Sequence, residues 1–129
     1  MKILLDTHVF IWLVTEDPQL TEKAKKIFLD SDNDIYLSIA SIWEMAIKLS
    51  IGKLCLEEPL ENLLPRELKI NGIYILPIEL KHVMIVAGLP FHHRDPFDRI
   101  LIAQCQAENL PILSSDINFK KYEIKRIWE

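Results

Sequence analysis

Ile3-Leu4-Leu5-Asp6 is a short, unbroken apolar run that ends in an acid. An apolar run without polar alternation predicts a strand that is buried on both faces, as in a parallel sheet. Similar runs occur at residues 35–37, 73–76 and 111–113, and residues 124–128 indicate a fifth strand. Segments with helical spacing lie between these runs. The alternation predicts an α/β fold, a three-layer α/β/α sandwich with a short, mostly parallel sheet.

Several of the predicted helices have recognisable ends. Thr21 is the predicted N-cap of the second helix, and Ser38 or Ser41 can cap the helix over residues 39–51. Gly72 follows the next helix, as glycine often does at a helix C-terminus. We find no internal repeat or linker, so one domain over residues 1–129 is expected.

Composition and charge limit the classes of function. Half of the chain is hydrophobic (50%), which excludes a disordered protein. The net charge of −4, from 15 basic and 19 acidic residues, has the wrong sign for binding nucleic acid through bulk electrostatics. Binding of nucleic acid would therefore need a local basic patch or metal ions.

The cysteines and the apolar segments indicate the compartment. Cys55 and Cys105 lack the spacing of a zinc or redox site, so buried free thiols in a reducing cytosol are expected. No apolar stretch approaches the roughly 18 residues of a membrane span, and a signal peptide is poorly supported. The sequence thus favours a cytoplasmic protein without a membrane segment.

Two acids open the predicted helix that runs to Glu108. Asp95 precedes Pro96, so it is the predicted N-cap with proline at the first helical position. Asp98 then lies in the first turn, on the same face and at the positive end of the helix dipole. Plain capping and dipole compensation would also explain two acids in a first turn.

Three further acids make a functional site at one sheet edge plausible on physical grounds. Asp6 and Asp116 each follow a predicted strand, and ligands of open parallel sheets bind outside the carboxyl ends of the strands. Glu44 stands in an otherwise apolar helix, where the alternative is an ion pair with Lys48 one turn away. If Asp6, Glu44, Asp98 and Asp116 converge, their repulsion requires a cation, and oxygen ligands favour Mg²⁺ or Mn²⁺. Zinc at His92-His93 is not indicated, because a third ligand is missing.

Four segments, taken in order, resemble one family. They are Leu4-Leu5-Asp6-Thr7-His8, Ser41-Ile42-Trp43-Glu44, the stretch from His93 to Gln104, and Leu113-Ser114-Ser115-Asp116. Together they resemble PIN domain ribonucleases and, among these, the VapC-type toxins of toxin-antitoxin pairs.

The resemblance implies a fold, an activity and partners. It implies a PIN-like fold and a metal-dependent endoribonuclease whose acidic residues Asp6, Glu44, Asp98 and Asp116 hold Mg²⁺ or Mn²⁺. Thr7 and Ser115 would orient a metal-bound water or a carboxylate. The implied partners are an RNA substrate, a small cognate antitoxin and a second copy of the chain. Apolar residues 10–14 and the leucine-rich fourth helix agree with a homodimer.

Other functions remain open at the level of sequence. A response-regulator receiver shares the length and the strand pattern, but it needs an acidic pair after the first strand. A catalytically silent PIN-like scaffold that binds RNA or protein is the second alternative. For an RNA substrate, the basic side chains that can be nominated as phosphate contacts are Lys48, Lys53, Arg94, Arg99, Lys120, Lys121 and Arg126.

Overall fold

The structure is a computed structural model that describes residues 1–128, and its centre is a five-stranded parallel sheet. The strand order is β3-β2-β1-β4-β5, and each neighbouring pair is parallel. The predicted apolar runs all form strands, including the fifth. The strands are β1 (Lys2–Leu5), β2 (Asp34–Ser38), β3 (Tyr74–Leu76), β4 (Ile112–Leu113) and β5 (Arg126–Ile127).

Helices connect the strands, and their ends follow the capping signals of the sequence. Thr21 accepts a hydrogen bond from the Ala24 amide, and Ser38, rather than Ser41, accepts one from the Ala40 amide. Gly72 ends α4 with a left-handed φ of 62°, which glycine adopts without strain. The helices are α1 (Thr7–Val14), α2 (Glu22–Leu29), α3 (Ile39–Ser50), α4 (Leu60–Asn71), α5 (Leu80–Val86), α6 (Pro96–Glu108) and the 3-10 helix η1 (Ile117–Lys121).

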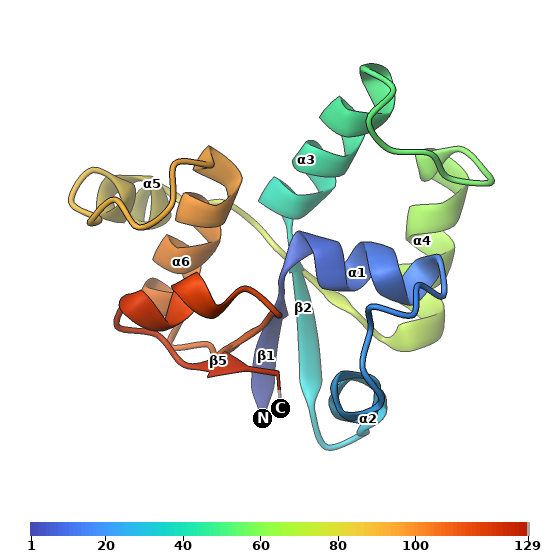
Figure 1. Ribbon diagram of the computed structural model, residues 1–129, viewed down its shortest axis with the longest axis horizontal. Helices are drawn as coiled ribbons and strands as arrows, with labels where there is room; N and C mark the ends of the chain where they lie inside the picture. The colour runs from blue at the N-terminus through green and yellow to red at the C-terminus, as the bar shows by residue number, and fades with distance from the viewer. Residues whose placement is uncertain (129) are drawn as a thin grey trace.

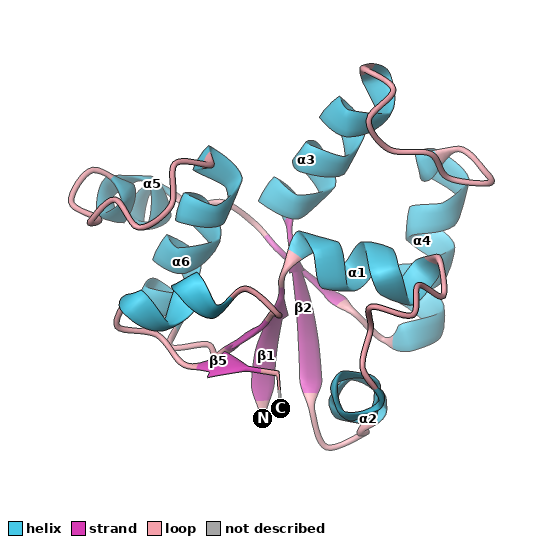
Figure 2. Ribbon diagram, viewed as in Figure 1, coloured by secondary structure: helices cyan, strands magenta, loops and turns pink. Residues whose placement is uncertain are grey.

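The sheet separates two apolar clusters, as the prediction of a three-layer sandwich requires. Ile3 and Leu5 of β1 pack in the cluster that contains residues of α1, α2 and α4, whereas Leu4 packs in the cluster with residues of α5 and α6. Figures 1 and 2 show α1, α2 and α4 on one side of the strands and α5 and α6 on the other. Helix α3 continues from β2 beyond the carboxyl edge of the sheet (Figure 1).

The strand order also predicts the position of a ligand-binding crevice at the carboxyl edge of the sheet. The chain builds the sheet from β1 through β2 to β3 in one direction, and then returns to add β4 and β5 on the other side of β1. Ligands of such sheets bind at the carboxyl ends, where the strand order reverses. That point lies between β1 and β4. The order differs from the 2-1-3-4-5 order of receiver domains, which excludes the receiver alternative.

Two expectations about the surface are wrong. Cys55 is exposed, because it lies in the loop between α3 and α4; Cys105 is buried in α6 as expected. Phe10 belongs to the core, and residues 11–14 pack against the same cluster, so α1 offers little free apolar surface. Within residues 1–128, none of the helices has the length and apolar character needed to cross a membrane.

Candidate metal centre

Asp6 enters the crevice because it directly follows β1. Its backbone N–H donates to the carbonyl of Leu113 at 3.1 Å, which joins the ends of β1 and β4. Asp6 holds the N-cap position of α1 but makes no side-chain cap bond, so its carboxylate is free for other contacts. The hydroxyl of Ser114 donates to its Oδ2 at 2.7 Å, whereas Oδ1 is buried without a hydrogen-bond partner in the part of the chain that the structure describes.

Asp116 enters the same crevice from the end of β4, as expected from the pairing of β1 with β4. Its Oδ1 accepts from the Asn118 amide at 2.9 Å, and its Oδ2 lies 2.8 Å from Nε2 of His93. Its own amide donates to the Ser114 hydroxyl at 3.0 Å. Ser114 therefore links Asp6 and Asp116 through one side chain.

The start of α6 supplies the third carboxylate. Asp95 accepts from the amides of Phe97 and Asp98, at 2.8 and 3.4 Å, and is therefore the N-cap. The side chain of Asp98 makes no such bond, and it lines one pocket of about 460 Å³ together with Asp6 and Asp116. The other residues that line this pocket are His8, Trp12, Gln19 and Ser115.

Glu44 lies beside this pocket and does not line it. Its buried carboxylate pairs with Lys48 at 2.9 Å, the ion pair that was the structural alternative for this acid. Its charge nevertheless raises the pKa of both Asp6 and Asp98. Glu44 thus adds negative charge to the crevice, while Lys48 offsets part of it.

The three pocket carboxyls have different affinities for protons. Burial, followed by the charges of Asp6 and Asp95, raises the pKa of Asp98 to about 8. Burial also raises the pKa of Asp6, against the opposing hydrogen bond from Ser114. For Asp116 burial acts in the same direction, but hydrogen bonds from His93 and from the Asn118 amide lower the pKa below its ordinary value.

These residues fit a small divalent cation. Neighbouring acids raise the pKa of the buried Asp6 and of the half-buried Asp98, and neither side chain forms an ion pair with Lys or Arg within residues 1–128. The unpartnered Oδ1 of Asp6 is an available ligand atom in the same place. Oxygen donors of this kind suit Mg²⁺ or Mn²⁺ rather than zinc.

One sequence-based assignment needs correction, and the structure shows the surroundings of two others. Arg99 is not available to phosphate, because its buried guanidinium donates to the backbone carbonyls of Val86, Leu89, Pro90 and His93. The hydroxyl that bonds a carboxylate belongs to Ser114, while Ser115 is exposed at the rim. Thr7 is buried and donates to the Ser41 hydroxyl at 2.8 Å.

The remaining basic residues differ in availability. Lys48 is engaged with Glu44, and Arg126 donates to the carbonyl of Ser115 at 3.1 Å. Arg94 is exposed, directly before the cap of α6. Lys53, Lys120 and Lys121 are exposed as well.

His93 and Ser114 are the site residues that sequence reasoning missed. The ligand atoms of His93, Asp98 and Asp116 lie within 4.8 Å of one another. Both missed residues stand inside the segments that carry the family resemblance, which was the available signal. Their roles depend on a contact across 23 positions and on one across 108, and local patterns do not reveal these.

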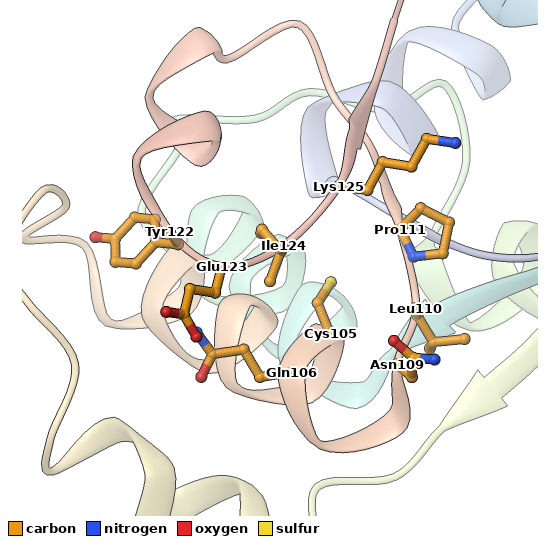
Figure 3. A pocket seen from close by; sticks show the side chains of 9 residues that line it. All are labelled: Cys105, Gln106, Asn109, Leu110, Pro111, Tyr122, Glu123, Ile124 and Lys125. Atoms are coloured by element: carbon orange, nitrogen blue, oxygen red, sulfur yellow. The ribbon is translucent and has the colours of Figure 1, made fainter.

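Two other features of the molecule do not have the character of a metal site. A hollow of about 620 Å³ lies at the opposite end of α6, near the amino ends of β4 and β5, and Glu123 is its only acid (Figure 3). Glu79, His82 and Glu108 also form a cluster. There Nδ1 of His82 accepts from the Glu79 amide, so its Nε2 carries a hydrogen toward Glu108, as in a helix cap and not as in a metal site.

The chain is similar to known proteins in sequence pattern and in fold. The model of the family described as "PIN domain" matches residues 3–125. A comparison with curated proteins found no match. Among solved structures, a chain of VapBC2 from Rickettsia felis, bound to a DNA fragment from its promoter, has a TM-score of 0.73 at 18% identity, with 100% of each chain covered.

Two further structures are similar to this chain. For FitAcB from Neisseria gonorrhoeae the TM-score is 0.66 at 23% identity, with 97% of this chain and 96% of that chain covered. For VapBC-5 from Mycobacterium tuberculosis, a member of the VapBC family of toxin-antitoxin systems, it is 0.62 at 19% identity, with 99% and 98% covered. At these identities the similarity concerns the fold.

Proposed function

The chain belongs to the PIN domain family, and from this premise we propose that it is an endoribonuclease dependent on Mg²⁺ or Mn²⁺. The observation that carries the proposal is the pocket shared by Asp6, Asp98 and Asp116, where Oδ1 of Asp6 is buried without a hydrogen-bond partner in residues 1–128 and neighbouring acids raise the pKa of Asp6 and of Asp98. A catalytically silent scaffold would gain nothing from this repulsion, which lowers stability. Residues 1–129 would form one domain, and the protein would act in the cytoplasm.

The side chains have distinct parts in the proposed reaction. Asp6, Asp98 and Asp116 would hold the ion, and Glu44 would supply further negative charge behind them. When bound, such an ion lowers the pKa of a water and stabilises the charge that develops on a leaving phosphate oxygen. Ser114 orients Asp6, and the cap bond of Asp95 orients the first turn that carries Asp98. Arg94 is the exposed basic side chain nearest in sequence to this turn and would contact a substrate phosphate.

We further propose that the protein is the toxin of a toxin-antitoxin pair, active as a homodimer and inhibited by a small antitoxin. Similarity to VapBC structures supports this role. The acidic pocket would accept a basic antitoxin side chain, most suitably arginine, because a guanidinium can bind two carboxylate oxygens at once. Co-expression with the product of an adjacent small gene should abolish cleavage. Cleavage that continues in a stable complex would contradict this part of the proposal.

A cleavage assay with defined metal ions tests the enzymatic proposal. Purified protein should cut single-stranded RNA with Mg²⁺ or Mn²⁺, and EDTA should abolish cleavage because no basic side chain replaces the ion. Asp6→Asn and Asp116→Asn should each remove most of the activity while the far-UV circular dichroism stays unchanged. Unchanged RNA cleavage in EDTA would refute metal dependence.

A further inference from the structure

His93 contacts Asp116, and the reaction proposed above gives it no role. Its buried ring stacks on Phe119 with centroids 4.7 Å apart. Its Nε2 lies 2.8 Å from Oδ2 of Asp116, and its Nδ1 lies 3.2 Å from the hydroxyl of Tyr122. The imidazole is thus held at both nitrogens and on one face.

The hydrogen bonds of His93 determine what its Nε2 does. The backbone N–H of His92 donates to the Tyr122 hydroxyl at 3.1 Å, so a lone pair of that oxygen is used and its hydrogen is available for Nδ1. An ionised carboxylate can only accept, so the contact with Asp116 requires a hydrogen on Nε2. The contact with Asp116 therefore places a hydrogen on Nε2 of His93, while the Tyr122 hydroxyl bonds Nδ1.

We propose that His93 is a positioning residue for Asp116, and that Tyr122 positions His93 through its contact with Nδ1. The inference rests on the proposed function and names the residues that prepare its site. Because Asn118 binds Oδ1 and His93 binds Oδ2, the plane of the carboxylate is set from both oxygens. Each oxygen has a further lone pair for a cation. Among residues 1–128, no such pair of bonds holds both carboxylate oxygens of Asp6 or of Asp98, so Asp116 is the ligand that is in place before the ion binds.

The same geometry argues against His93 as a ligand of the ion itself. Its Nε2 is near enough to join Asp98 and Asp116 around one cation. To do so it would have to move its hydrogen to Nδ1, which would then face the Tyr122 hydroxyl. That oxygen would accept two hydrogen bonds, and its own hydrogen would lose its only acceptor in residues 1–128. The hydrogen-bond chain therefore favours the positioning role.

Binding of Mn²⁺ without RNA tests the proposal separately from catalysis. The affinity of the full chain is measured by electron paramagnetic resonance of free Mn²⁺. His93→Ala should weaken binding by about 10- to 100-fold, the usual effect of losing a partner of a metal ligand. His93→Gln should restore most of it, because its amide keeps an N–H donor, and Tyr122→Phe should cause a smaller loss. The control is His92→Ala, which keeps its backbone N–H and should bind Mn²⁺ like the wild type.

Each outcome decides the matter. Wild-type affinity in a folded His93→Ala variant would overturn the positioning role while the proposed function stands. A nitrogen coupling to bound Mn²⁺ that is lost in His93→Gln would also overturn it, because His93 would then be a ligand. A wild-type protein that binds no Mn²⁺ would refute the proposed function together with this inference. If His93→Ala does not fold, nitrogen NMR of the wild type decides, since an Nε2 without a hydrogen would contradict its donation to Asp116.

Discussion

At the scale of the residue, Asp95 and Asp98 show how one turn separates two acids by role. Proline disfavours helical geometry in the residue before it, so Asp95 adopts the extended backbone of an N-cap, with a ψ of 119°. Asp98 has helical geometry and leaves its carboxyl to the pocket. Asp95 thus stabilises the start of α6, and the carboxyl of Asp98 is available for the proposed reaction.

We expect the two substitutions to separate stability from activity. Asp98→Asn should abolish RNA cleavage without loss of stability, because it removes a ligand of the ion and keeps a side chain of the same size. Asp95→Ala should lower the free energy of unfolding by about 0.5 to 2 kcal/mol, the usual loss for a cap, and retain substantial activity well below its melting temperature. Urea unfolding and cleavage assays on both variants measure this. A stable but inactive Asp95→Ala beside an active Asp98→Asn would exchange the roles.

The protonation of Asp98 also predicts a dependence of stability on pH. Its pKa is raised to about 8. Above about pH 4 the unfolded chain has lost this proton while the folded protein keeps it, so the contribution of Asp98 to stability falls as the pH rises toward about 8. The D98N variant lacks this contribution.

As the pH rises from about 5 to about 8, the wild type should therefore lose unfolding free energy that D98N does not lose. The difference in unfolding free energy between D98N and the wild type should shift toward D98N by at least about 1.4 kcal/mol, the equivalent of one pKa unit. Urea unfolding of both proteins in EDTA, at each of these two pH values, measures the shift. Saturating Mg²⁺ should reduce the difference, because the ion stabilises the ionised carboxylate only in the wild type. A difference that is independent of pH would contradict a raised pKa for Asp98.

At the scale of the element, α6 is joined to the segment after α5 by Arg99. Its guanidinium donates to four backbone carbonyls of residues 86–93 and lies over the Phe91 ring, 4.1 Å from its centroid. One of these carbonyls belongs to His93, so the same arginine supports the residue that contacts Asp116. The sequence indicated a basic residue near the site, but burial gives it a structural role.

Arg99 and Arg94 form a matched pair for a test. Arg99→Ala should lower the free energy of unfolding by about 3 kcal/mol, because several buried carbonyls lose their donor. Arg94→Ala removes an exposed charge and should leave the melting temperature unchanged while raising KM for RNA. Thermal unfolding and cleavage kinetics on both variants check this. A destabilised Arg94→Ala, or an Arg99→Ala that unfolds like the wild type, would contradict the assignment.

At the scale of the whole molecule, the sequence predicted what depends on local pattern and on the order of elements. Unbroken apolar runs predicted the strands, and acids directly after β1 and three residues after β4 predicted Asp6 and Asp116, because parallel strands end at a common edge. The bond between Ser114 and Asp6 could not be predicted in this way, since it depends on which neighbouring serine turns inward. His93 and Arg99 illustrate the same limit, because loop conformation decides whether a polar side chain is buried.

The exposed apolar residues of the molecule place the expected homodimer interface on α3 and not on α1. Ile39, Trp43 and Ile47 lie at i, i+4 spacing on α3 and are 39%, 58% and 36% exposed, whereas α1 packs into the core. Burying this stripe against a second copy would remove apolar surface from water. We expect a dimer by light scattering at micromolar concentration, which Trp43→Glu should convert to a monomer. Ile70→Glu on α4, where the isoleucine is 70% exposed, is the control and should leave the dimer intact. A monomeric wild type, or a dimer that survives Trp43→Glu and dissociates with Ile70→Glu, would show that α3 is not the interface.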